Sequence, residues 1–214
     1  MFGNFNLETI LLRIPAIIIA LTVHEFSHGF AAYRLGDKTA KRDGRLSFNP
    51  LKHIDPVGLI CLLVVGFGWA KPVMVNPYNL KDPKQDMAII SAAGPLSNFI
   101  FAFVVLLIYF PLAVKFFYGG VIISYLLKFI WVLFSINIVL GIFNLLPIPP
   151  LDGSKIFSVF LPTRTYFKFT GFRYGFIILI ILIYTGLTSN ILQPLMTAVY
   201  NGYFFAVERI YFFL

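Results

Sequence analysis

The chain of 214 residues is 59% hydrophobic and only 12% charged, and it carries a net charge of +8. A soluble domain is about one quarter charged, so this composition excludes an ordinary soluble protein and predicts a surface that faces lipid. The basic residues lie in short connections between apolar runs rather than in a stripe interleaved with aromatic residues, which argues against nucleic acid as a partner. The single cysteine, Cys61, excludes an internal disulfide.

The first apolar run predicts a membrane helix over residues 8–34. No basic segment precedes the run and Arg13 interrupts its start, so we expect it to stay in the mature protein rather than to be removed as a signal peptide. The run ends near the sequence RLGD, where Gly36 is suited to cap a helix.

A polar connection, a short apolar run and a second polar connection follow. The apolar run over residues 57–69 is too short for a full crossing, which favours a re-entrant or interfacial segment. In the second connection the sequence PVMV predicts a short extended piece, because Pro77 and Pro83 oppose helix. We therefore expect a re-entrant or extended segment near residues 57–80.

Later apolar runs predict membrane helices over residues 87–113, 121–146 and 174–188. The helix over 121–146 stops where three prolines stand close together in LLPIPPLDG. The aromatic tail at 190–214 suits an interfacial helix or a further crossing. The predicted fold class is an all-α polytopic membrane protein with about four to six transmembrane helices.

Lysine and arginine indicate how these helices are oriented. They collect in residues 34–86 and again in the connection after the helix at 121–146, whereas the connection between those two holds only Lys115. The basic connections are expected in the cytoplasm. We therefore expect a multi-pass protein of the cell membrane in which the ends of the first and third long helices share the cytoplasmic face.

The sequence HEFSH places two histidines and a glutamate inside the first helix, where lipid penalises ionisable side chains. His24 and His28 are four residues apart, so on a helix they project from one face and can bind one metal ion. In this H-E-x-x-H arrangement two imidazoles hold Zn²⁺ and Glu25 takes a proton from the metal-bound water. The alternative is a pair of buried histidines hydrogen-bonded to neighbouring helices.

A catalytic zinc site usually has three protein ligands and one open position, so a third ligand is needed. His53 is one candidate, although the charged loop before it favours a solvated histidine at the interface. Asp152 is another, because a proline-broken helix end can aim a carboxylate into the bundle at the depth of the first two histidines. On these signals alone, a turn or N-cap role for Asp152 is the favoured interpretation. The other acidic candidates near cytoplasmic helix ends are Asp37, Asp55 and Asp86.

The segments HEFSH, AGPLSN and NLLPIPPLDG, in this order, resemble the site-2 protease family of intramembrane zinc metalloproteases, in particular its small bacterial and archaeal members without a PDZ domain. The connecting segments RLSFNPLKHIDPVG and GWAKPVMVNP are similar to that subgroup, and the similarity covers roughly residues 20–155. The resemblance implies one zinc ion per chain, held by His24, His28 and Asp152, with Glu25 as the general base.

Two amides in apolar helices, Asn98 and Asn144, need partners to be tolerated in lipid. The resemblance implies that both lie beside the active site, where amide donors can stabilise an oxyanion or hold an extended substrate. For Asn137 we expect a role in helix-to-helix packing. Gly94, four residues before Asn98, would allow two helices to approach closely.

The resulting prediction is an intramembrane zinc metalloprotease that hydrolyses peptide bonds in or near transmembrane segments of a membrane protein or peptide substrate. We expect one integral membrane domain over residues 1–214, with a catalytic core at about 8–160 and C-terminal helices at about 172–214. The PVMV piece could add a strand to an unwound substrate. Two other functions stay open, a zinc-binding membrane scaffold without protease activity and a small metal or proton transporter.

Overall fold

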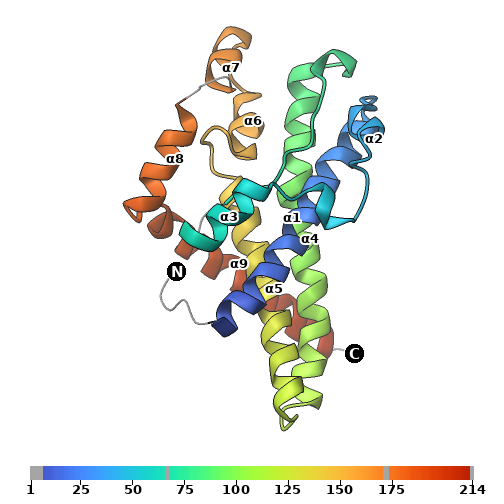
Figure 1. Cartoon of the computed structure of the whole chain (residues 1–214), viewed down its shortest axis with the longest axis vertical. Helices are drawn as coiled ribbons and strands as arrows, with labels where there is room; N and C mark the ends of the chain where they lie inside the picture. The colour runs from blue at the N-terminus through green and yellow to red at the C-terminus, as the bar shows by residue number, and fades with distance from the viewer. Residues whose placement is uncertain (1–6, 66–67, 171–173, 213–214) are drawn as a thin grey trace.

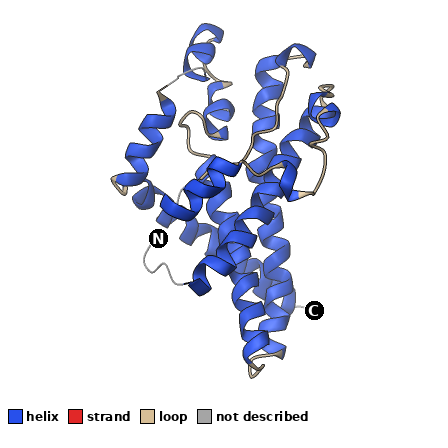
Figure 2. Cartoon of the chain, viewed as in Figure 1, coloured by secondary structure: helices blue, strands red, loops and turns tan. Residues whose placement is uncertain are grey.

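The computed structural model describes residues 7–65, 68–170 and 174–212, and this part of the chain is helical and contains no strand (Figures 1 and 2). The all-α fold predicted from the sequence is confirmed. In chain order the elements are α1 (Leu7–Arg34), α2 (Thr39–Arg42), a 3-10 turn (Pro50–Lys52), α3 (Pro56–Val65), a second 3-10 turn (Pro77–Asn79), α4 (Pro83–Lys115), α5 (Val121–Asn144), α6 (Asp152–Ser158), α7 (Thr163–Thr170), α8 (Gly175–Tyr184) and α9 (Leu187–Phe212).

Three of these helices, α1, α4 and α5, are long and apolar enough to cross a membrane. They correspond to the runs predicted over 8–34, 87–113 and 121–146. Helix α4 begins earlier than predicted because Asp82 caps it, accepting hydrogen bonds from the backbone of Lys84 and Gln85, each at 3.1 Å. Because α8 is apolar but only 10 residues long, crossings beyond these three stay a prediction.

The three long helices form a central bundle in which α4 and α5 make a hairpin and α1 packs against both (Figure 1). Ala16 and Ala20 of α1 and Ala102 of α4 are fully buried, and such small side chains let membrane helices approach closely. Phe134 and Ile138 of α5 fill the space between the helices. Tight packing of this kind is needed because lipid is as apolar as the side chains themselves.

The C-terminal region consists of α8 and the long helix α9. Helix α8 ends sooner than predicted because Gly186, at a φ of 75°, turns the chain before α9 begins. Helix α9 packs against α4 and α5. Its tyrosines fix it there, since the Tyr203 hydroxyl donates to Phe99 O at 2.9 Å and the Tyr211 hydroxyl donates to Leu107 O at 2.6 Å.

The short apolar run folds as α3, whose 10 residues reach only about 15 Å and cannot cross about 30 Å of hydrocarbon. The chain before and after α3 is joined by an antiparallel bridge between Ile54 and Ala70, and Lys71 N donates to His53 O at 2.9 Å. The two ends of the segment therefore lie side by side, as expected for a re-entrant piece. Residues 66–67, which were part of that prediction, lie outside the described residues.

The proline-rich segment after α5 turns the chain so that α6 starts beside the end of α5. The Pro149–Pro150 peptide bond is cis. Gly153 packs directly on the chain it follows, because a Cβ at this position would overlap the carbonyl groups of Leu145 and Leu146. This close approach places Asp152, the first residue of α6, at the level where α5 ends.

Helix α1 ends in a Schellman motif, which confirms Gly36 as its cap. Gly36 has a φ of 109°, and the N–H of Asp37 reaches back to Ala32 O at 2.9 Å. The carboxylate of Asp37 is fully buried and accepts hydrogen bonds from Thr39 N (3.0 Å), Thr39 Oγ1 (2.6 Å), Asn76 N (2.8 Å) and Asn79 Nδ2 (2.7 Å). It thereby ties the end of α1 to the turn before α4.

These contacts also decide the protonation of Asp37. Burial by itself would raise the pKa of this carboxyl, but the hydrogen bonds from Thr39, Asn79 and Asn76 outweigh burial and hold the pKa below its ordinary value. The folded protein therefore binds a proton at this group less readily than the unfolded chain does. The stabilisation from Asp37 is full above a pH of about 4 and is lost as the pH falls through the lowered pKa.

We expect Asp37→Ala to lower the free energy of unfolding by about 2–4 kcal/mol at neutral pH, because buried donors without acceptors cost about 1–3 kcal/mol each. Thermal unfolding in detergent measures the loss, and the gap between variant and wild type should narrow below a pH of about 4. Asp43→Ala, at an exposed aspartate of the next turn, is the matched control. Equal melting temperatures for the two variants would contradict the role assigned to Asp37.

Candidate metal centre

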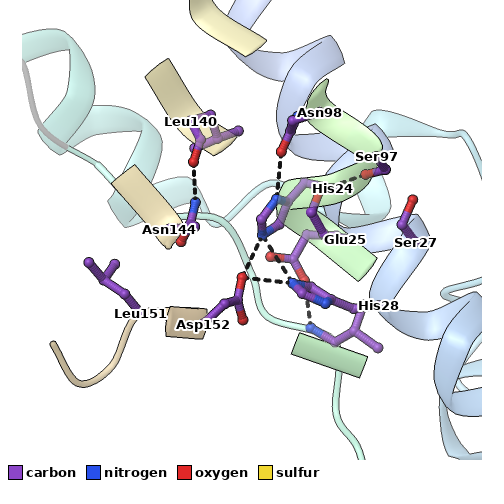
Figure 3. Close-up of polar contacts among 12 residues, drawn as sticks. His24, Glu25, Ser27, His28, Ser97, Asn98, Leu140, Asn144, Leu151 and Asp152 are labelled. Atoms are coloured by element: carbon purple, nitrogen blue, oxygen red, sulfur yellow. Dashed lines mark hydrogen bonds and ion pairs between the residues drawn. The ribbon is translucent and has the colours of Figure 1, made fainter. Parts of the chain in front are cut away.

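Helices α1 and α6 bring three side chains to one point (Figure 3). His24 Nε2 and His28 Nε2 are 3.0 Å apart, and each lies 3.1 Å from Asp152 Oδ2. All three residues are buried. The two histidines share a face of α1 as their spacing predicts, and the turn after α5 supplies the carboxylate from 124 residues further along the chain.

The hydrogen bonds of the two outer imidazole nitrogens, Nδ1 of His24 and of His28, determine which ring nitrogen is left to bind a metal ion. His24 Nδ1 lies 2.7 Å from Asn98 Oδ1, and His28 Nδ1 lies 2.7 Å from Ile90 O. Both partners are carbonyl oxygens, which only accept, so each Nδ1 carries a proton and donates it. Nε2 is therefore the nitrogen of each ring that is left to bind a metal ion, and both Nε2 atoms face the Asp152 carboxylate.

This arrangement fits a metal ion. Three electron-rich atoms within about 3 Å of one another in a buried site need a proton or a metal cation among them. Two imidazole nitrogens and one carboxylate oxygen form a donor set used by catalytic zinc sites. Zinc–ligand bonds of about 2.0–2.2 Å would place neighbouring ligands of a tetrahedron about 3.3–3.6 Å apart, so the observed spacing is slightly shorter and a small outward shift of the ligands would admit the ion.

Glu25 lies next to this group on α1 and is also buried (Figure 3). Its Oε2 accepts a hydrogen bond from the backbone N–H of Val73 at 2.9 Å. Val73 belongs to the PVMV piece, which has no regular secondary structure. Sequence reasoning expected an extended piece there but missed its contact with Glu25, since a backbone amide leaves no signature in the residue pattern.

A chain of amides supports His24 from behind. Besides accepting from His24, Asn98 donates through Nδ2 to Ala20 O at 3.2 Å and to Asn137 Oδ1 at 2.8 Å. Asn137 in turn donates to Leu133 O at 2.8 Å. Both amides are fully buried, and both N–H groups of Asn98 are engaged. Asn137 thus bridges α5 and α4, as expected for a residue that packs helices together.

Asn144 has a different environment at the end of α5. It is partly buried, and its Nδ2 donates to Leu140 O at 3.0 Å (Figure 3). This single contact engages one of its two N–H groups.

The other sequence candidates for a third ligand lie elsewhere. His53 is 1% exposed and donates through Nε2 to Ser47 O at 2.8 Å, so the expectation of a solvated histidine is wrong. It is buried because residues 45–54 fold against the chain that returns from α3. The three remaining aspartates hold turns or helix starts: Asp37 after α1, Asp55 before α3 and Asp86 at the start of α4.

Helix α4 approaches the metal centre through Gly94. A Cβ at this position would lie 2.5 Å from both Cε1 and Nε2 of His28, and 2.6 Å from Cε1 of His24. No side chain fits there, because both imidazoles would have to move away from Asp152. The close approach of helices expected from this glycine is therefore confirmed, and it lies at the metal centre itself.

We expect Gly94→Ala to reduce zinc affinity at least about 10-fold, because the added methyl displaces both imidazoles from their common point. Zinc content measured against a competing chelator reports the change. The matched control is Gly202→Ala in α9, where nothing lies within 4 Å of the new Cβ. If both variants keep wild-type affinity, Gly94 does not set the position of the rings.

Comparisons with known proteins identify the family of the chain. The model of peptidase family M50 matches residues 13–120 and 111–184. The chain is also similar to three proteins whose names begin "Putative zinc metalloprotease". YwhC of Bacillus subtilis (strain 168) is 42% identical over 85% of this chain and 84% of its own length. Rip2 of Mycolicibacterium smegmatis is 30% identical over 82% and 67%. MJ0611 of Methanocaldococcus jannaschii is 31% identical over 72% and 73%.

No solved structure matches the chain at a significant level. The family match covers more than half of the chain, and the similarity to YwhC extends over most of both proteins. The chain therefore belongs to peptidase family M50, the site-2 protease family of intramembrane zinc metalloproteases.

Proposed function

We propose that this peptidase holds its zinc with His24, His28 and Asp152 and uses Glu25 as the general base that hydrolyses a peptide bond. The observation that carries the proposal is the convergence of three lone-pair donors beside a buried glutamate. Zinc bound there acts as a Lewis acid toward water and the peptide carbonyl.

Glu25 supplies the proton transfers. Its carboxylate takes a proton from the attacking water and passes it to the leaving amine, which lets one residue serve as base and then as acid. Because Oε2 accepts the Val73 N–H, we assign the transfers to Oε1. The fixed Oε2 keeps the carboxylate from turning away from the site.

The two amides take separate roles in this proposal. Asn98 orients His24, since its oxygen accepts from Nδ1 and both of its N–H groups are engaged elsewhere. Asn144 retains an N–H beyond its contact with Leu140, and we assign to it the stabilisation of the oxyanion or of the substrate backbone.

The substrate is a membrane protein or membrane peptide that is cleaved near the cytoplasmic end of its helix. His28 lies six residues before Arg34, where α1 ends, which corresponds to about 9 Å along the helix axis. The basic connection that follows α1 supports a cytoplasmic position for this end. The substrate helix has to unwind, because helical hydrogen bonds occupy its carbonyl groups, and we assign strand addition to the PVMV piece around Val73.

A zinc-binding scaffold and a small transporter are the rival functions. Neither requires a general base, whereas Glu25 is buried and held beside the metal centre. A scaffold would leave this buried, oriented carboxylate without a role, whereas a transporter would use it in a proton or metal path and is distinguished by its metal content. The M50 family is one of peptidases, which also favours hydrolysis.

We expect Glu25→Gln to lower kcat/KM at least about 100-fold while the protein keeps about one zinc per chain, since the amide cannot accept the water proton. Cleavage of a detergent-solubilised transmembrane peptide, together with zinc content, measures both. Glu8→Gln, near the start of the same helix, is the control. Unchanged cleavage with zinc retained would refute the base assignment, and ion flux without bound metal would favour a transporter.

Replacing Asn98 and replacing Asn144 should have different effects on zinc affinity and on the rate of cleavage. We expect Asn98→Ala to weaken zinc binding about 10- to 100-fold, because His24 Nδ1 loses its acceptor. Asn144→Ala should leave zinc affinity unchanged and reduce the rate of cleavage about 10-fold or more. Chelator competition and steady-state kinetics on both variants check this, and a reversed pattern would contradict the assignment.

A further inference from the structure

We propose that Arg45 is a positioning residue that holds Glu25 in its working orientation through one peptide group of the chain. The inference deepens the proposed function and rests on Glu25 being the general base. Arg45 lies in the connection between α2 and α3 and is 7% exposed.

The link between Arg45 and Glu25 runs through the peptide bond that joins Pro72 to Val73. Arg45 Nη2 donates to Pro72 O at 2.8 Å, and the N–H on the other side of this peptide bond, that of Val73, donates to Glu25 Oε2 at 2.9 Å. The Arg45 cation and the Glu25 carboxylate thus hydrogen-bond to opposite ends of one peptide dipole. Each polarises the group for the other, and such chains of hydrogen bonds strengthen cooperatively.

A second contact fixes the direction of the peptide group. Arg45 Nη2 also donates to Lys71 O at 3.0 Å, so the guanidinium holds two successive carbonyls. Proline at position 72 has no N–H, so this residue cannot donate a hydrogen bond to hold the segment in place. The hydrogen bonds from Arg45 therefore hold the Lys71 and Pro72 carbonyls in place.

The surrounding chain makes Arg45 and the segment from Ala70 to Val73 one unit. The Ile54–Ala70 bridge and the hydrogen bond from Lys71 N to His53 O join the two stretches. This unit lies on α1 at Gly29, one turn beyond Glu25, where a Cβ would lie 3.1 Å from Leu46 Cδ2 and 3.5 Å from Val73 Cγ1. A displacement of the unit would therefore reach Glu25 directly.

The positive charge of Arg45 also supports an interaction with Glu25 through this peptide group. Within the described residues its hydrogen bonds go to the two carbonyls only, and its Nη1 is buried without a partner. Burying a guanidinium with such partial compensation costs free energy, and a neutral donor would serve a purely structural clamp at lower cost. The positive charge is explained by the carboxylate at the far end of the peptide dipole.

We expect Arg45→Ala to lower kcat about 10- to 100-fold, because a misdirected base loses its alignment with the reacting water. KM and zinc content should stay near wild type. The Arg45→Lys variant should keep part of the wild-type kcat, and added guanidinium ions should restore part of the kcat of the Arg45→Ala variant. The matched control is Lys52→Ala, which removes an exposed cation of the same connection that donates to Gly44 O. An Arg45→Ala variant with the kcat of Lys52→Ala would overturn the proposal.

A double variant separates this proposal from the function on which it rests. If Arg45 acts through Glu25, adding Arg45→Ala to Glu25→Gln should cause no further loss of kcat, whereas an equal further loss would overturn the positioning role. Full activity of Glu25→Gln alone would instead refute the general base. If Arg45→Ala does not fold, replacing Val73 by its α-hydroxy acid removes only the N–H. This ester should lower kcat about 10-fold, and an unchanged kcat would overturn the proposal.

Discussion

The convergence of two imidazole nitrogens and one carboxylate oxygen inside a membrane bundle is the constraint on which the site depends. His24 and His28 donate from their outer nitrogens to carbonyl oxygens, and the Nε2 atoms of both face the Asp152 carboxylate. In water such a cluster would relax by taking up protons or moving apart. Here helices α1, α4 and α5 confine it, which makes the cluster a candidate site for a divalent cation.

Backbone groups provide much of the confinement. Ile90 O of α4 orients His28, Ala20 O of α1 holds Asn98, and the Val73 N–H holds Glu25. The position of each of these groups depends on the register between helices, so packing far from the site is coupled to the geometry of the metal ligands. Gly94 illustrates the coupling, since the contact between α1 and α4 is also the contact between α4 and both imidazoles.

Sequence reasoning located the features that side-chain identity specifies. The i, i+4 spacing of His24 and His28 fixed their common face, and the run of prolines indicated where the chain could return a carboxylate, although only the resemblance selected Asp152 over His53. The lengths of the apolar runs gave the three long helices. These signals are strong because membrane burial makes every polar residue within a helix costly and therefore informative.

The features that were missed depend on the backbone or on distant packing. Nothing in the sequence indicates that Val73 presents its N–H to Glu25, or that His53 is buried by the chain returning from α3. Asn98 was expected at the active site as a donor to substrate, yet its hydrogen bonds connect it to His24 and Asn137. An asparagine that donates to substrate and one that orients a histidine look alike in the sequence. Only the helix register distinguishes the two roles.

The central claim is that one zinc ion lies between His24, His28 and Asp152. An anomalous-difference map of the purified, zinc-loaded protein, recorded on both sides of the zinc absorption edge, tests it most directly. The account predicts one peak per chain, bordered by the Nε2 atoms of both histidines and a carboxylate oxygen of Asp152. A peak at His53, or one at the two histidines with Asp152 turned away, would contradict it.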